Sequence, residues 1–209
     1  MRIDILSLFP SMFVGPFDTS MLKKAKDRNV VDIQIHDLRN WADNKHKQVD
    51  DRPFGGGPGM VLMVEPLYKA ITDLSSDTTH KILLSPRGKV FAQKRAVELS
   101  KKNHILLIAG HYEGFDERVR KYLIDEELSI GQYVLTGGEI PAMVITDAVV
   151  RHLPGVLEEE AKQSESFMEG GSLDYPVYTR PQEFNGWEVP EVLLSGNHSE
   201  IEKWRKENS

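Results

Sequence analysis

The stretch from Ala109 to Ala142 carries glycine at three turns, in the sequence AGHYEGFDERVRKYLIDEELSIGQYVLTGGEIPA. The turns lie at residues 110–114, at Gly131 and at residues 137–138, and each adjoins a short apolar run typical of a buried strand. Glycine admits positive φ and lets a ligand come close to main-chain N–H and C=O groups. Three such turns in one segment predict a single pocket, suited to a ligand held mainly by backbone contacts.

A long polar stretch from Asp37 to Gly59 contains a second glycine-rich run, DDRPFGGGPGM. A connection of this length in a compact domain is usually either functional or disordered. Phe54 and Met60 give it apolar anchors, and a flexible connector does not need the adjacent carboxylates of Asp50 and Asp51. We therefore interpret the stretch as a functional loop.

Other familiar site signatures are absent from the chain. The run GGGPGM lacks the Lys-Ser/Thr of a P-loop, no GxGxxG follows a strand, and HExxH and the EF-hand loop do not occur. The seven histidines lack metal-ligand spacing, and Ser85 has no GxSxG context. The absence of cysteine excludes disulfides, thiolate zinc sites and cysteine nucleophiles. The backbone-lined pocket is the site that these patterns leave.

The elements that must position these turns alternate between strands and helices, which predicts an α/β fold with a mostly parallel sheet. In such sheets ligands bind beyond the carboxyl ends of the strands, where the turns at Ser85-Pro86 and at residues 110–114 lie. Ser20 is a candidate helix cap. Hydrophobic periodicity predicts strands at 2–9, 31–35, 81–84, 104–109 and 128–135, and helices at 20–27, 65–74, 91–101, 115–124 and 139–153.

Charged residues in the helix expected at 115–124 have the spacing of surface ion pairs. Asp116 and Arg120, and Glu117 and Lys121, are four residues apart. This spacing predicts two ion pairs along one helix.

The character of the chain changes after Pro154. Residues 155–186 are rich in Glu, Ser, Gly and Pro with little periodicity, which is typical of a linker of about thirty residues. Residues 187–209 then read as a short helical unit anchored by Trp187 and Trp204. We expect a cofactor-binding domain over 1–154, a linker over 155–186 and the start of a helical domain over 187–209.

The overall composition is that of a globular protein of 209 residues with a net charge of −6 and a pI of about 5.7. This charge argues against a protein that grips nucleic acid over its whole surface, and leaves room for a local basic face. No signal core and no apolar run near the roughly 20 residues of a bilayer span occur, so the expected compartment is the cytoplasm.

Seven runs resemble the bacterial tRNA (guanine-N1)-methyltransferase family of the SPOUT class, and the resemblance covers nearly the whole chain: VDDRPFGGGPGM, LSPRG, AGHYEGFDERV, SIGQYVLTGGEIPAM, DAVVRHLPGVL, YTRP and VLLSGNH. It implies a SPOUT-type sheet with a deep trefoil knot over residues 83–138, which binds S-adenosylmethionine. By motif match the cofactor contacts fall on Leu84, Ser85, Pro86, Gly110, Tyr112, Glu113, Gly114, Ile130, Gly131, Tyr133, Leu135, Gly138 and Pro141, with Asp174 near the methionine part.

The same resemblance implies methylation at N1 of the guanine immediately 3′ of the anticodon. N1 carries a proton at neutral pH, so the reaction needs a general base and a cation for the charge that develops on O6. Glu165 stands where the family has an aspartate base before Ser-Phe, and Arg151 matches the arginine that stabilises that base.

The resemblance also implies a homodimer in which the linker of one subunit closes over the cofactor of the other, a tRNA anticodon arm as partner, and dependence on Mg²⁺. Gln132 and Val177 depart from the usual Asp and His, Glu165 departs from Asp, and the helical end at Ser209 is shorter than is usual in the family. Two alternatives remain open at this point: a SPOUT-type methyltransferase of another RNA, and a homologue that binds cofactor or RNA without catalysis.

Overall fold

The computed structural model describes residues 1–158, 166–167 and 174–209. The chain forms two compact units, of which the first is Met1–Leu157 and the second begins at Glu158. Each unit is described by itself. No helix in the described ranges is long and apolar enough to cross a membrane.

The first unit is built on a five-stranded sheet with the strand order β2-β1-β6-β5-β7, in which every pair is parallel. β1 lies between β2 and β6, so the amino-terminal strand is buried inside the sheet. Parallel strands covered on both faces need apolar side chains throughout, as in the run HILLIA of β6. The strands are β1 (Arg2–Ser7), β2 (Asp32–Asp37), β5 (His80–Val90), β6 (His104–Ala109) and β7 (Glu126–Ser129).

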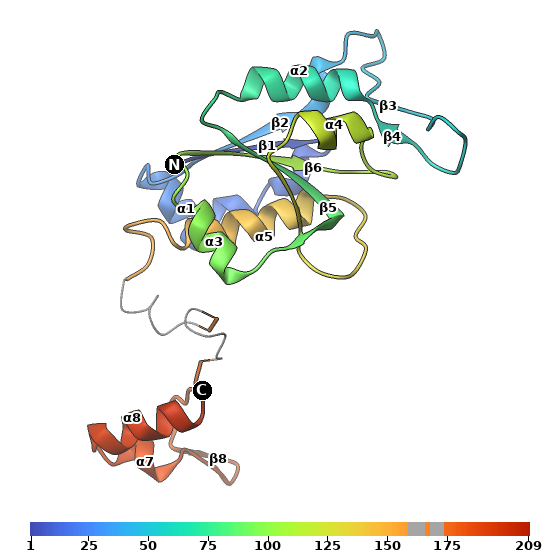
Figure 1. Cartoon of the computed structure of the whole chain (residues 1–209). Helices are drawn as coiled ribbons and strands as arrows, with labels where there is room; N and C mark the ends of the chain where they lie inside the picture. The colour runs from blue at the N-terminus through green and yellow to red at the C-terminus, as the bar shows by residue number, and fades with distance from the viewer. Residues whose placement is uncertain (159–165, 168–173) are drawn as a thin grey trace. The chain divides into compact units, whose positions relative to one another are not determined.

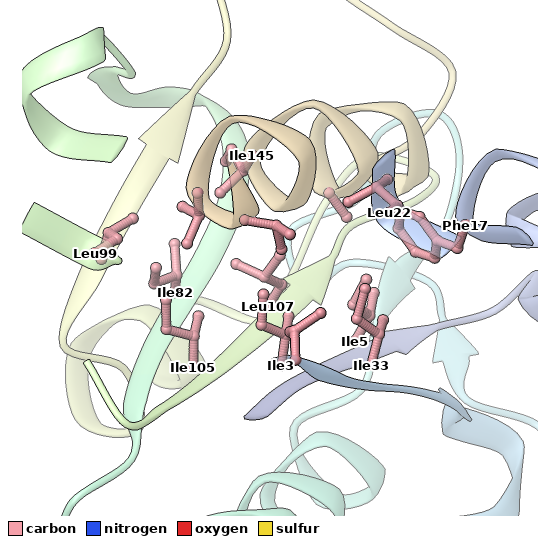
Figure 2. Packing of buried hydrophobic residues seen from close by; sticks show 14 of the residues in the cluster. Ile3, Ile5, Phe17, Leu22, Ile33, Ile82, Leu99, Ile105, Leu107 and Ile145 are labelled. Atoms are coloured by element: carbon pink, nitrogen blue, oxygen red, sulfur yellow. The ribbon is translucent and has the colours of Figure 1, made fainter. Parts of the chain in front are cut away.

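Helices cover both faces of the sheet, which gives three layers (Figure 1). Alternate residues of β1 separate the two cores: Ile3 and Ile5 join one cluster, and Leu6 joins the other. Figure 2 shows the first cluster, in which Ile145 packs over the strand residues. That face is covered by α1 (Ser20–Asp27), α3 (Gln93–Leu99) and α5 (Glu139–Val150), and the other by α2 (Val64–Leu74), α4 (Glu117–Tyr122) and the 3-10 helix η3 (Leu38–Trp41).

Shorter elements complete the first unit. The 3-10 helices η1 and η2 bring Phe13 and Phe17 into the first core. β3 and β4 form a small antiparallel pair that brackets the glycine-rich loop. Their bounds are η1 (Pro10–Phe13), η2 (Pro16–Asp18), β3 (Asp50–Asp51) and β4 (Val61–Leu62).

The expected α/β fold with a parallel sheet is confirmed, and the bounds of α1 and β6 agree with the periodicity. Two expected strands differ. β5 does not end at Leu84 but continues to Val90, and β7 ends at Ser129, so residues 130–135 are not a strand. The 130–135 run is apolar because it lines a pocket rather than a sheet.

Two local expectations, the cap of α1 and the ion pairs of α4, were wrong. Thr19, not Ser20, is the N-cap of α1, and no side chain caps that helix. The ion pairs of α4 are Asp116 with Arg118 and Glu117 with Arg120, in place of the two expected pairs at a spacing of four residues. Asp116 is the N-cap of α4, so its carboxylate accepts the main-chain N–H of residue 118 and meets that residue's guanidinium as well.

The second unit holds the antiparallel pair β8 (Glu183–Phe184) and β9 (Trp187–Glu188), followed by α7 (Glu191–Leu194) and α8 (His198–Glu207). Trp204 packs against Tyr178 with ring centroids 6.3 Å apart, as an anchor should. Trp187 is 71% exposed, so the expectation that it anchors this unit was wrong. It lies in a tight hairpin, where its ring meets only the neighbouring Phe184 among the ring contacts of the described residues.

Candidate functional site

A pocket of about 240 Å³ lies at the carboxyl ends of β6 and β7, beside residues 84–86 within β5. This is the edge at which parallel α/β sheets bind ligands. Four chain segments and one residue of α5 form its wall, and much of the wall is main chain because it includes five glycines. The lining residues are 84–86, 110–115, 128–131, 133–138 and Pro141.

The tightest point of the pocket is the crossing of two glycine segments. The Gly138 N–H donates to the Gly110 carbonyl at 2.7 Å. A Cβ on Gly138 would lie 2.6 Å from the Gly110 nitrogen and 2.7 Å from the Cα of Ala109. Only glycine fits, so this residue lets the start of α5 press against the end of β6.

The glycine-rich loop after β3 is tied to the pocket through main-chain hydrogen bonds. The Glu113 N–H donates to the Met60 carbonyl at 2.9 Å, and the Leu62 N–H donates to the Gly114 carbonyl at 2.9 Å. Gly59 has φ +77°, and a Cβ there would lie 2.4 Å from Cγ of Glu113. Phe54 is fully exposed within this loop. The loop therefore shares its base with the pocket wall and presents an aromatic ring to solvent.

A buried carboxylate lies behind the pocket at the start of α5. Glu139 is 1% exposed and accepts a hydrogen bond from the Ser7 hydroxyl at 2.7 Å. Its second oxygen lies 4.0 Å from Nδ1 of His111, whose side chain is 22% exposed and lines the pocket. These contacts connect three segments: the end of β1, the loop that follows β6, and the start of α5. They therefore hold the His111 side of the pocket in place.

The structure gathers every expected cofactor contact except Asp174 around this pocket. Asp174 lies in the second unit, where its main-chain N–H donates to the Ser166 hydroxyl at 2.8 Å. Arg151 is the C-cap of α5, and Glu165 lies outside the described residues. Within the described ranges, no group of three or more His, Asp, Glu or Cys side chains could hold a metal ion.

Sequence reasoning missed His111, Phe115 and Thr136, which also line the pocket. His111 stands between the expected contacts Gly110 and Tyr112, so its place in the turn was the available signal. The buried pair of Ser7 and Glu139 had no such signal, because these residues are 132 positions apart.

Comparison with known proteins gives one consistent result. A family model described as tRNA (Guanine-1)-methyltransferase TrmD matches residues 1–209. A tRNA (guanine-N(1)-)-methyltransferase of Dictyoglomus turgidum is 55% identical over 209 residues, which are all of this chain and 85% of the relative. Proteins of the same name from Carboxydothermus hydrogenoformans and Halalkalibacterium halodurans are 54% and 53% identical, again over the whole chain, and it covers 83% and 86% of them.

Proposed function

The chain belongs to the tRNA (guanine-1)-methyltransferase family, and from that premise we propose that it methylates N1 of the guanine immediately 3′ of the anticodon in tRNA. The observation that carries this proposal is the full-length match to relatives named for that reaction, together with a pocket of the expected backbone-lined kind. The enzyme class follows from the family; the position of the guanine is the finer part of the proposal.

We propose that the pocket binds S-adenosylmethionine, which supplies an activated methyl group when bound. The walls suit such a ligand, because their glycines let it come close to main-chain groups while Leu84, Ile130 and Leu135 offer apolar surface. The expected contacts at residues 84–86 and 110–114 would hold the adenosine and methionine parts through the backbone. By motif match, Asp174 is assigned to the methionine part of the cofactor.

The protein's own chemistry in this proposal is the removal of one proton. The carboxylate of Glu165 would accept the proton on guanine N1, and the electron pair left on N1 would take the methyl group as the bond from that methyl to the sulfur of the donor breaks, with its electrons left on sulfur. Arg151, at the end of α5, stabilises the negative charge that develops on the base. The pocket holds the methyl donor, and these two residues hold and deprotonate the acceptor.

We propose that two copies of the chain form the working enzyme, with the linker of one copy closing over the pocket of the other. An exposed apolar patch beside the pocket supports this arrangement: Met12, Val14, Ile140 and Val144 are 41%, 75%, 46% and 42% exposed. Met12 belongs to η1, which packs against α5, the helix that carries Ile140 and Val144. Apolar patches of this kind mark interaction surfaces.

The remaining parts of the proposal concern organisation. Residues 83–138 would form the knot, 1–154 the cofactor-binding domain, 155–186 the linker and 187–209 the start of the tRNA-binding helical domain, with the cytoplasm as the place of action. The Mg²⁺ expected from the resemblance does not fit the described residues, which offer no cluster of metal ligands, and no step is assigned to it.

Methyl transfer from labelled S-adenosylmethionine to a tRNA transcript tests the function. We expect label in a transcript with guanine 3′ of the anticodon and none when that guanine is replaced by adenine. Cofactor binding without any transfer would overturn the enzymatic assignment. Equal transfer to both transcripts would overturn the assigned position.

A further inference from the structure

Strand β5 leaves the sheet and rejoins it beside the cofactor pocket. Leu84 pairs with Leu128 of β7, and Lys89 pairs with the same Leu128, so the residues between them bulge out of the strand. Ser85 and Pro86, the first residues of this bulge, line the pocket. Bulges commonly redirect a strand at a functional site. The shape of residues 85–88 therefore sets one wall of the pocket.

The bulge closes against β7 at Gly88. A Cβ on Gly88 would lie 2.5 Å from both the main-chain nitrogen and the carbonyl carbon of Leu128, so no side chain fits there. This close approach fixes the end of the bulge, but it leaves the beginning at Ser85 to be held by other contacts.

The Ser85 hydroxyl holds the beginning of the bulge. It donates to Oε1 of Glu127 at 2.6 Å and accepts the Arg87 main-chain N–H at 3.0 Å. A serine hydroxyl has a single hydrogen, and here that hydrogen is committed to Glu127. Ser85 therefore contacts a ligand through its main chain or its remaining lone pair, and its side chain serves the shape of the bulge.

Glu127 is itself held from the side of α4. Its side chain is 13% exposed, and Nη1 of Arg120 lies 3.8 Å from its second oxygen. Arg120 also pairs with Glu117, which lies 3.7 Å from Arg87 in the bulge. The hydrogen bond from Arg120 lowers the pKa of Glu117, as expected for a paired carboxylate. A carboxylate as buried as Glu127 needs such partners, because burial without them is costly.

We propose that Glu127 is a positioning residue for the cofactor pocket, which acts through the Ser85 hydroxyl to hold residues 85–88 in the conformation that binds S-adenosylmethionine. Glu127 is not among the residues that line the pocket. Its effect therefore falls on cofactor affinity and not on the chemical step. This inference rests on the proposed function, because it takes S-adenosylmethionine as the ligand.

The test compares Glu127→Ala, Glu127→Gln, Ser85→Ala and the double variant Ser85→Ala/Glu127→Ala in the full chain. Calorimetric titration with S-adenosylmethionine gives Kd, and methyl transfer to tRNA gives KM and kcat. We expect Glu127→Ala to raise Kd and KM for S-adenosylmethionine about tenfold, because one hydrogen bond to a charged group has about that effect. The value of kcat should stay within about twofold of the unaltered protein. Glu127→Gln should stay near the unaltered protein, because its amide oxygen can accept the same hydroxyl.

Coupling between the two residues separates positioning from a general loss of structure. Once Ser85 is alanine, Glu127→Ala should cause no further loss of affinity, whereas independent effects would multiply. Glu126→Ala is the matched control. Glu126 is the adjacent residue of β7 but bonds Arg95 and His80 instead, so its variant should keep the unaltered Kd.

The outcomes distinguish this inference from the proposed function. If the unaltered protein does not bind S-adenosylmethionine, both are overturned. If it binds and Glu127→Ala leaves Kd unchanged, or lowers kcat alone, or multiplies with Ser85→Ala, the positioning role alone is overturned. Should Glu127→Ala fail to fold by circular dichroism, Ser85→Ala remains as a test, because an unchanged Kd in that variant overturns the positioning role by itself.

Discussion

Asp4 shows how a single charged residue is accommodated inside the sheet. Its side chain has no exposed surface, and its oxygens lie 2.6 Å from Nε2 of His36 and of His104 and 2.7 Å from Nε of Arg2. Burial would raise the pKa of Asp4, but the hydrogen bonds from His36, Arg2 and His104 together outweigh it and lower that pKa to about 2. The charged form is therefore the one that the folded protein stabilises.

The depressed pKa of Asp4 predicts acid sensitivity. Its contribution to the free energy of unfolding, about 2 kcal/mol, is fully present above the unfolded-state pKa near 3.8 and is lost as pH falls toward about 2. Urea unfolding between pH 6 and pH 2 should show this loss, and Asp4→Asn should flatten that part of the pH profile. An unchanged slope in Asp4→Asn would show that other groups cause it.

At the proposed catalytic residues, we expect turnover and cofactor affinity to separate. Glu165→Gln should lower kcat by roughly 10² to 10⁴, the usual contribution of a general base, and Arg151→Ala should lower it as well. Both should keep Kd for S-adenosylmethionine near that of the unaltered protein. Glu165→Asp, which restores the family's residue type, is the control that should retain activity. A parallel loss of cofactor binding would mean that the roles are misassigned.

Residue types predicted the residues that line the pocket better than the residues that hold the lining in place. The glycines at 110, 131 and 138 indicated a backbone-lined site, because glycine lets a ligand come close to main-chain groups. Glu127 and Glu139 gave no such sign, because a glutamate that bonds a serine far away in the chain looks like any surface glutamate. Such pairs are visible only once the strands are in register.

At the scale of elements, the crossing of Gly110 and Gly138 is where two segments have the least freedom. Gly138→Ala should weaken cofactor binding at least tenfold and cost about 1–3 kcal/mol of folding free energy, because its Cβ would overlap the main chain of β6. Calorimetric Kd values and urea unfolding measure the two effects. Gly155→Ala is a control: Gly155 has φ +80°, whereas Gly138 has φ −86°, and a Cβ on Gly155 meets nothing within 4 Å, so this variant should keep the unaltered Kd.

Hydrophobic periodicity predicted the bounds of a strand that is buried along its whole length. It failed for a strand that is interrupted by a bulge. β6 is apolar along its whole length and its bounds were correct. The extension of β5 beyond Leu84 was missed, because Ser-Pro-Arg-Gly is turn-like by composition and the bulge depends on β7, over 40 residues later. The run at 130–135 looked like a strand because an apolar pocket wall and a buried strand have the same composition.

For the whole molecule, the exposed patch of Met12, Val14, Ile140 and Val144 predicts self-association. We expect the unaltered protein to sediment as the proposed dimer, and Ile140→Arg combined with Val144→Asp to sediment as a monomer that has lost methyl transfer. Tyr122→Asp, on α4 at the other face of the sheet and 77% exposed, should leave the dimer intact. A monomeric unaltered protein that is fully active would contradict the proposal.

At this scale the fold class could be predicted from the sequence, but a knot in the chain could not. Alternating strands and helices were enough for a parallel α/β sheet, since each strand needs a helical crossover to return. A knot leaves no mark on periodicity, because threading a loop changes neither burial nor local conformation. The proposed knot is inferred only from the resemblance of motifs such as AGHYEGFDERV to the family.

The position of β1 between β2 and β6 also has a consequence for the synthesis of the protein. β1 is the first strand to be synthesised, yet it pairs with β6, where Arg2 lies opposite His104, and Ser7 bonds Glu139. At ordinary rates of translation the hundred residues between these strands take roughly 5 to 20 s to appear. During this time the edge of β1 that pairs with β6 has no partner strand, and Ile3 and Ile5 are not covered from that side. The nascent chain thus carries an interior strand of the sheet exposed to chaperones and to aggregation until more than half of the protein has been synthesised.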